Sequence, residues 1–453
     1  MLGGAVALRL AIGIGFANYD TLYSLVWGQQ LARGQTPAYG VALAPTPHPL
    51  LELAGFVLAP LGAGATLWIV VALAYLALAW LGYLVYLLGA RWFSRPVGLA
   101  AAAILLSRYE VLSYGARAYA DIPYVALVLA ALAVESRRAR AGVPVLALLA
   151  LAGLLRPEAW LFAGVYWLYL WPSASPRRRA ATAALVALAP VLWGLSDLAV
   201  TGNALWSLTN TRATAHQLNR ATGIANVPYY GARRIGEVLG PDGLVGAALG
   251  GALALWLARS RALLGAGAGL VALAAFAIIA AFGLPIQDRY VFLIAALLCV
   301  FAGAALAGWR TLSPRGPWLA AAAISALAVL ASIAWDVPRF QKTFAGTRPK
   351  DQALSAQQRI QDDLVALISD HAICTPISIP YASPQPLLAL RLHVSPARIH
   401  VAVLARGTYL APASRAVFTE LQLDARDPVR AAPRPAGFTL VARNRSWIAY
   451  ERC

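Results

Sequence analysis

Long apolar runs alternate with short polar connections from the start of the chain to residue 335. Runs such as 67–88, 180–200 and 318–335 are nearly free of charge and have the length of about 20 residues that a helix needs to cross a bilayer. Because lipid offers no hydrogen bonds to an open backbone, each run is predicted to be a helix. The pattern predicts about eleven transmembrane helices, of which residues 2–17 form the first.

The pattern changes after residue 335. Apolar residues recur at helical spacing within 351–369, and apolar residues alternate with others over 399–403 as in a strand. Two further stretches, 438–442 and 447–450, are typical of a hairpin. We therefore predict an α-helical polytopic transmembrane domain over 1–335 and a small C-terminal α/β domain over 336–453.

Composition and charge agree with a membrane protein. Hydrophobic residues make up 60% of the chain, against about 45–50% in soluble proteins. The net charge of +18 would indicate nucleic-acid binding in a soluble protein, but here it predicts no nucleic-acid partner. The arginines cluster between apolar runs, at every second connection, where the positive-inside rule places cytoplasmic turns: 91–95, 137–140, 177–179, 259–261 and 310–315.

This alternation predicts the topology. The N-terminus is expected in the cytoplasm, and the C-terminal domain and the remaining connections outside. Heavy use of Arg, Ala, Gly and Pro is typical of a high-GC bacterium, so the inner (plasma) membrane is the expected location.

The chain has three cysteines. Cys299 falls in an apolar run, where it serves as a small apolar residue. Cys374 and Cys453 fall in the domain placed outside, where oxidation is permitted. A disulfide between them would stabilise the domain by about 4 kcal/mol in the chain-entropy model; the alternative is two unpaired thiols.

Carboxylates and arginines gather in the outer connections. Asp20 follows the first run and is either a general base or the N-cap of the next helix, whose apolar residues Leu22, Leu25, Val26 and Leu31 are expected to lie on lipid. The other members of this set are Arg117 with Asp121, Arg156 with Glu158, and the triplet Asp288, Arg289 and Tyr290. Each charge could instead pair with a neighbour or extend to the membrane surface.

Taken together, these residues predict a reaction at a lipid phosphate. Arginine binds phosphate oxygens whose charge grows as a lipid phosphate departs, and a carboxylate takes the proton of an attacking hydroxyl. We expect Arg117, Arg156 and Arg289 to converge near Asp20, paired with carboxylates or holding an anion, because unpaired buried charge is costly. His48 is either a solvated loop residue or a supporting site residue. Residues 202–241 form either a lid over the donor or an amphipathic segment on the headgroups.

Short motifs carry a resemblance to a known family: NYD at 18–20, TPHPL at 46–50, RAYADIP at 117–123, RPEAW at 156–160, GNALWS at 202–207 and DRYVF at 288–292. Over roughly residues 1–335 the chain resembles the GT-C glycosyltransferases. It is similar to the bacterial enzymes that use polyprenyl-phosphate sugars, among them protein O-mannosyltransferases, aminoarabinose transferases and actinobacterial arabinofuranosyl- and mannosyltransferases.

The resemblance implies that Asp20 is the catalytic base, that Asp121 supports it in the active site, and that transfer inverts the sugar in a single displacement. Two departures are visible: Thr21 follows Asp20 where many relatives have Glu, and the second outer connection lacks Asp-x-Asp. No cofactor is therefore predicted, a divalent metal being possible but not indicated.

The expected function is a membrane glycosyltransferase of cell-wall biosynthesis. It would move an arabinofuranose- or mannose-like sugar from a polyprenyl-phosphate donor to an extracytoplasmic glycan, lipid or protein acceptor. The alternative is a transporter or flippase of lipid-linked sugars, although transporters typically place ionisable groups at mid-membrane and show inverted repeats. A scaffold or receptor would predict featureless outer connections.

Overall fold

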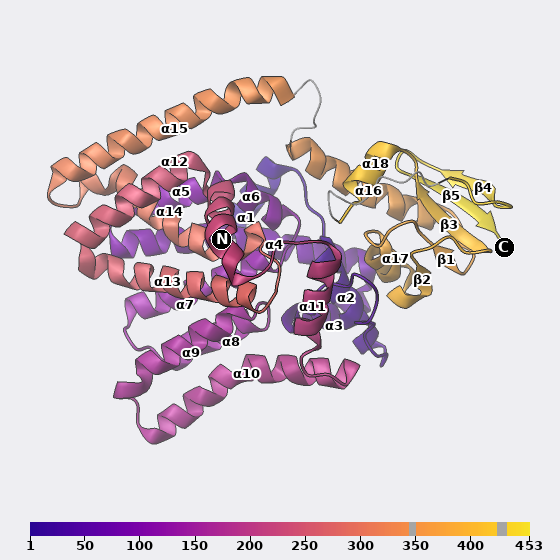
Figure 1. Cartoon of the computed structure of the whole chain (residues 1–453), viewed down its shortest axis with the longest axis horizontal. Coiled ribbons are helices and arrows are strands. Elements are labelled where there is room, and N and C mark those ends of the chain that lie inside the picture. The colour runs from indigo at the N-terminus through magenta and orange to yellow at the C-terminus, as the bar shows by residue number, and fades with distance from the viewer. Residues whose placement is uncertain (344–349, 424–432) are drawn as a thin grey trace.

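A computed structural model describes residues 1–343, 350–423 and 433–453. A bundle of helices forms one side of the molecule and a small mixed domain the other (Figure 1). The helices of the first part are α1 (Leu2–Ile12), α2 (Tyr19–Ala32), α3 (Pro49–Leu58), α4 (Gly62–Trp92), α5 (Arg95–Leu106), α6 (Tyr109–Ala116), α7 (Asp121–Arg137), α8 (Val143–Gly153), α9 (Glu158–Leu170), α10 (Pro176–Thr201), α11 (Trp206–Gln217), α12 (Val227–Leu257), α13 (Arg259–Ala281), α14 (Phe292–Ala307) and α15 (Arg315–Thr343).

Several of these helices are long and apolar enough to cross a membrane. Within the described residues there are six such segments, or seven if α5 and α6, which meet at a bend of 67°, count as one span. The predicted runs 67–88 and 180–200 lie within α4 and α10, and 318–335 lies within α15. The chain is a multi-pass membrane protein, but the predicted count of about eleven spans is not confirmed, because α1, α7, α8 and α9 fall short of the roughly 20 residues of a full span.

The first predicted run, 2–17, does not form one continuous helix. α1 ends at Ile12, where Gly13 adopts a left-handed conformation with φ 71° and its N–H donates to the Arg9 carbonyl oxygen. Glycine tolerates this conformation because it has no Cβ. The chain from Gly13 to Asn18 has no regular secondary structure and leads directly to α2.

Close helix contacts form the core of the bundle. The faces of α14 are almost entirely buried against α5, α12 and α15. At the contact of α12 with α14, a Cβ on Gly250 would lie 1.9 Å from the Phe301 carbonyl oxygen. Glycine at this position therefore sets how closely the two backbones approach.

The C-terminal part is a small α/β domain, as predicted. Its sheet has the order β2-β1-β3-β5-β4, in which β1 pairs in parallel with β2 and β3, and β5 pairs antiparallel with β3 and β4. The elements are α16 (Lys350–Asp370), β1 (Ile377–Ser378), α17 (Gln385–Leu392), β2 (Ile399–His400), β3 (Gly407–Pro412), α18 (Arg415–Glu420), β4 (Thr439–Arg443) and β5 (Trp447–Arg452).

Of the local predictions for this domain, the helix and the hairpin are confirmed and the strand is partly wrong. The helix over 351–369 is α16, and the hairpin is β4 with β5. The strand over 399–403 is wrong beyond His400, because β2 is a short edge strand and the chain leaves the sheet there, with Val401 and Val403 exposed. A disulfide joins Cys374 to Cys453, with Cα atoms 6.0 Å apart.

The C-terminal domain covers α2. Leu22, Leu25 and Val26 are each 1% exposed and belong to one apolar cluster with Leu387 and Leu388 of α17, which lies beside α2 in Figure 1. The expectation that these three residues lie on lipid is therefore wrong, because a protein surface takes the place of the bilayer there. Leu31, the fourth residue of the predicted face, is 41% exposed.

Polar contacts join the two parts at the same interface. Tyr23 donates from its hydroxyl to Gln385 Oε1 at 2.9 Å, and the Gly15 N–H donates to Gln358 Oε1 at 2.9 Å. The small domain is thus fixed above the connections that carry the predicted site.

Candidate active site

A cavity of about 930 Å³ lies between the helical bundle and the C-terminal domain. Its wall comes from the connections that the sequence predicted to be outer, from α10, α11 and α13, and from α16 and the segments around α17 and α18. Most of the residues predicted as site residues line it: Asp20, His48, Arg117, Arg156, Glu158, Asp288, Arg289 and Tyr290. Asp121, which is 1% exposed, lies behind this wall and contacts it through ion pairs.

The start of α2 presents Asp20 to the cavity. Asn18 is the N-cap, since its Oδ1 accepts hydrogen bonds from the N–H groups of Asp20 and Thr21 at 2.8 and 3.2 Å. The alternative that Asp20 itself caps the helix is therefore wrong. Asn18 also donates to the Arg117 carbonyl oxygen, and Thr21 to that of Ala118, which fixes the start of α2 against the turn after α6.

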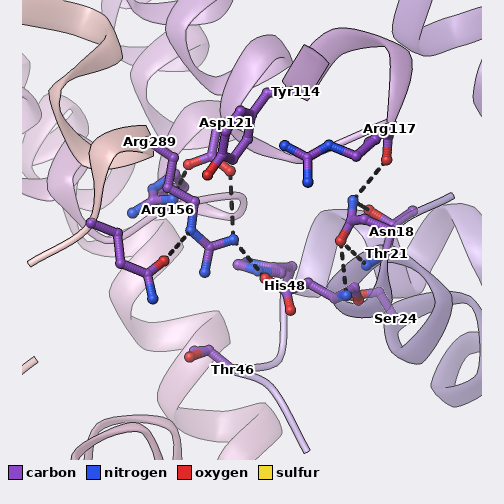
Figure 2. Close-up of polar contacts among 12 residues, drawn as sticks. Asn18, Thr21, Ser24, Thr46, His48, Tyr114, Arg117, Asp121, Arg156 and Arg289 are labelled. Atoms are coloured by element: carbon purple, nitrogen blue, oxygen red, sulfur yellow. Dashed lines mark hydrogen bonds and ion pairs between the residues drawn. The ribbon is translucent and has the colours of Figure 1, made fainter. Parts of the chain in front are cut away.

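A chain of alternating charges runs along the cavity wall. Nη1 of Arg289 lies 2.6 Å from Asp20 Oδ2 and 3.8 Å from Asp121 Oδ2. The other oxygen of Asp121 contacts Arg156, whose Nη2 lies 2.6 Å from Glu158 Oε1. Figure 2 shows Arg156, Arg289 and Asp121 gathered at one place. Residues from four separate connections thus form one network, and Glu158 Oε2 within it is buried without a hydrogen-bond partner.

Arg117 approaches the cavity differently. Its guanidinium carbon lies 4.7 Å from the ring centroid of Tyr114 and 5.0 Å from that of Tyr119, and it is set apart from the other two arginines in Figure 2. Over residues 1–343, 350–423 and 433–453 it forms no ion pair with a carboxylate. Its charge is held by cation–π contacts, so it can accept an anion without losing an ion pair.

Asp288 and Tyr290 support the arginines. Asp288 Oδ1 accepts hydrogen bonds from the Tyr114 hydroxyl at 2.8 Å and from the Arg289 N–H at 2.9 Å. The Tyr290 ring lies 4.2 Å from the Arg156 guanidinium carbon and 5.5 Å from that of Arg289. Asp288 therefore orders the turn that carries Arg289, and Tyr290 supplies an aromatic surface to both guanidinium groups.

The environment of the cluster shifts the pKa values of several groups, among them Asp20 and His48. Burial favours a higher pKa for Asp20, but the Arg289 guanidinium outweighs it and holds the Asp20 pKa below its ordinary value. Burial lowers the pKa of His48 to about 4, so the ring is neutral at neutral pH. Nδ1 of His48 is 2.8 Å from the Leu155 carbonyl oxygen; this acceptor requires Nδ1–H and leaves Nε2 as an acceptor. His48 is buried, so it is not a solvated loop residue.

The segment 202–241 is more ordered than a loop. It contains α11, whose residues Ser207, Leu208 and Thr211 line the cavity together with Arg220. Asp197 of α10 was not among the predicted site residues, although it lines the cavity and is 1% exposed. A carboxylate inside an apolar run was the available signal, because such residues mark functional positions in membranes.

Groups of three or more His, Cys, Asp or Glu arranged to hold a metal ion are not found in the part of the chain that the structure describes.

Comparison with known proteins identifies the fold. No protein-family model matches the chain, and no curated protein matches it in sequence. Two solved structures of ArnT from Cupriavidus metallidurans do match. The one bound to undecaprenyl phosphate has a TM-score of 0.61 at 12% identity, covering 98% of this chain and 97% of that chain. The apo state has a TM-score of 0.60 at 14% identity, covering 98% and 96%. The chain therefore has the fold of ArnT over nearly its whole length, and the resemblance to the GT-C fold is confirmed at the level of fold.

Proposed function

We propose that this chain is a membrane glycosyltransferase that moves a sugar from a polyprenyl-phosphate donor to a hydroxyl acceptor. The observation that carries the proposal is the network of Asp20, Arg289, Asp121 and Arg156. This network lies at the wall of a cavity between the apolar helical bundle and the C-terminal domain. The fold supports it, since ArnT was solved with undecaprenyl phosphate bound.

In the proposed reaction Asp20 is the general base. Its carboxylate takes the proton of the acceptor hydroxyl while the hydroxyl oxygen forms a bond to the anomeric carbon of the donor. The bond from that carbon to the phosphate oxygen breaks, and its electron pair leaves with the polyprenyl phosphate. A single displacement of this kind inverts the anomeric centre, and Arg117, Arg156 and Arg289 stabilise the charge that grows on the phosphate.

Donor binding would also activate the base. In the empty cavity Arg289 lies 2.6 Å from Asp20 and lowers its pKa. A phosphate in the cavity attracts the same guanidinium and weakens its hold on the carboxylate. Burial then raises the Asp20 pKa toward the value that suits a base at neutral pH.

The cavity offers a separate wall to each part of the substrates. Apolar residues at and just before the start of α11, in α13 and in the turn after α13 provide a path for the polyprenyl tail: Leu205, Leu208, Ile278, Ile279 and Phe282. The C-terminal domain provides neutral and acidic polar groups for the acceptor: Gln357, Gln361, Ser383, Glu420 and Gln422. The acceptor is a glycan, lipid or protein, and the sugar is arabinofuranose- or mannose-like.

The proposed placement follows the charge pattern. The transmembrane domain is 1–335 and the C-terminal domain is 336–453. The N-terminus lies in the cytoplasm of a bacterium, and the cavity and the C-terminal domain lie on the outer face of its inner membrane, because the arginine clusters occupy the opposite connections.

The test is a donor-cleavage assay. Purified protein in lipid nanodiscs is incubated with polyprenyl-phosphate mannose or arabinofuranose and acceptor glycans, and released polyprenyl phosphate is measured. Wild type should release it only with an acceptor, and Asp20→Asn should not. A flippase would move the lipid across a vesicle membrane without cleaving it, and that result would replace the proposal.

A further inference from the structure

One recess of the cavity is not used by the mechanism above. It is formed by the segment before α3, by α9 and α10, and by the start of α11. Its polar and aromatic side chains are His48, Trp160, Trp193, Asp197 and Ser207, all of which line the cavity. The recess adjoins the charged network, because His48 bonds to the carbonyl of Leu155, the residue before Arg156.

The carboxylate of Asp197 lies in this recess without a cationic partner among the residues that the structure describes. Its Oδ2 accepts from the Ser207 N–H at 2.7 Å and its Oδ1 from the Ser207 hydroxyl at 2.9 Å. Within the described residues no Arg, Lys or His forms an ion pair with it. Each carboxylate oxygen has two lone pairs, so each can accept one more hydrogen bond. Both oxygens thus have a partner within the protein, and each keeps acceptor capacity that a ligand in the cavity can use.

The neighbouring groups have matching chemistry. Nε2 of the neutral His48 ring is an acceptor, because Nδ1 donates to Leu155. The Trp193 ring lies 6.2 Å from the His48 ring and 5.7 Å from the Trp160 ring, both in edge-to-face geometry. Aromatic surfaces beside hydrogen-bond acceptors suit a ligand with apolar C–H faces and several hydroxyl donors.

We propose that this recess binds the sugar that is transferred, with Asp197 and His48 accepting hydrogen bonds from its hydroxyl groups and Trp193 packing against its C–H face. The inference rests on the proposed function, and it specifies the class of sugar. A neutral pentose or hexose fits, whereas a uronic acid would place a second carboxylate beside Asp197. The position next to the arginines fits the donor sugar, since the acceptor wall belongs to the C-terminal domain.

The alternative is that Asp197 only fixes the start of α11 to α10. Binding measurements separate the two roles. Affinity is measured for polyprenyl phosphate and for polyprenyl-phosphate mannose, with the arabinofuranose donor in parallel. Asp197→Asn keeps the size of the side chain and an oxygen for Ser207. This substitution should weaken the affinity for the sugar-bearing lipid by about tenfold or more, as expected for the loss of a charged hydrogen bond. The affinity for the bare lipid phosphate should stay unchanged.

Two further variants guard against a folding defect. His48→Asn keeps a donor for the Leu155 carbonyl but removes Nε2, so it should show the same selective loss, and His48→Gln should retain more affinity. The matched control is Glu135→Gln, which changes a buried carboxylate that accepts hydrogen bonds from Arg140 N–H, Ala141 N–H and the Tyr166 hydroxyl away from the cavity. This control should not change the affinity for one lipid relative to the other.

Equal weakening of both lipids by Asp197→Asn, or none, overturns the sugar site while leaving the glycosyltransferase proposal intact if the wild type cleaves donor. A wild type that binds the sugar-bearing lipid no better than the bare phosphate also overturns the sugar site. A wild type that cleaves no donor refutes the proposed function itself.

Discussion

Two buried Arg–Asp pairs in this protein have similar exposure and different surroundings. The side chains of Arg108 and Asp242 are 15% and 11% exposed, and those of Arg289 and Asp20 are 15% and 18% exposed. Arg289 belongs to the set of charged residues that the sequence predicted as site residues, whereas Arg108 lies between α5 and α6 and was not in that set. Only the second pair lines the cavity.

The first pair is satisfied by its protein partners. Both oxygens of Asp242 accept from Arg108, at 2.9 and 2.7 Å, and Arg108 also donates to the carbonyl oxygens of Ile104 and Leu239. These contacts join the break between α5 and α6 to the kink of α12 at Gly240, where φ is 72°. The pair therefore stabilises two interrupted helices.

The second pair shares its charges more widely. Arg289 contacts Asp20 through one oxygen and approaches Asp121, which also contacts Arg156. In such a network an arginine can bind a phosphate in place of a carboxylate, while each charged group keeps an oppositely charged neighbour. Burial and ion pairing alone therefore do not distinguish these two sites; the shared ion pairs beside a cavity do.

The largest expected effect separates the two carboxylates. Asp20→Asn removes the base with little change of size, so transfer should fall by about 10²–10⁴-fold at unchanged thermal stability. Asp242→Asn should instead destabilise the fold by about 3–5 kcal/mol while the remaining folded protein turns over normally. Turnover and thermal unfolding are measured on both variants, and near wild-type turnover by Asp20→Asn would contradict the assigned mechanism.

The next effect concerns the two arginines and pH. Arg289 lowers the Asp20 pKa and burial raises it, so Arg289→Gln should raise that pKa above its value in the wild type. A base with a raised pKa is protonated earlier as the pH falls, so the acid limb of kcat/KM should move to higher pH. Arg108→Gln is the control and should leave the limb in place. If Arg289→Gln moves the limb to lower pH, or not at all, Asp20 is not the titrating base.

A smaller effect is expected for donor affinity. Arg117 forms no ion pair with a carboxylate among the described residues, so Arg117→Ala should weaken polyprenyl-phosphate binding by about tenfold with little change in stability. Arg138→Ala and Arg178→Ala, in predicted cytoplasmic clusters, should leave donor affinity unchanged. Equal losses in all three variants would argue against a specific phosphate site at Arg117.

The smallest effect on turnover is expected for the disulfide. Cys374 and Cys453 should be resistant to alkylation in non-reduced protein analysed by mass spectrometry. Cys374→Ser should lower the stability of the C-terminal domain by about 2–4 kcal/mol and change transfer little, because neither cysteine lines the cavity. Finding both thiols alkylated would refute the bridge and weaken the external placement of this domain.

The sequence alone determined the helical bundle, the mixed C-terminal domain and most of the charged residues that meet at the cavity. Apolar runs must be helical in lipid, and charges that are expensive in a bilayer gather at one depth, so Asp20, Asp121, Arg156 and Arg289 could be grouped before any contact was known. The helical spacing over 351–369 and the hairpin pattern over 438–450 are local signals, and α16 and the β4–β5 hairpin formed where these signals predicted.

Which residues contact each other depended on the tertiary structure. Arg289 lies 269 residues from Asp20 in the chain, and Arg108 finds Asp242 rather than the active-site carboxylates. The C-terminal domain covers α2, which a pattern of apolar residues cannot distinguish from contact with lipid. Asp197 gains its place in the cavity only because α10 and α11 meet at Ser207. Periodicity reports which face of an element avoids water, whereas the packing of distant segments decides what lies against that face.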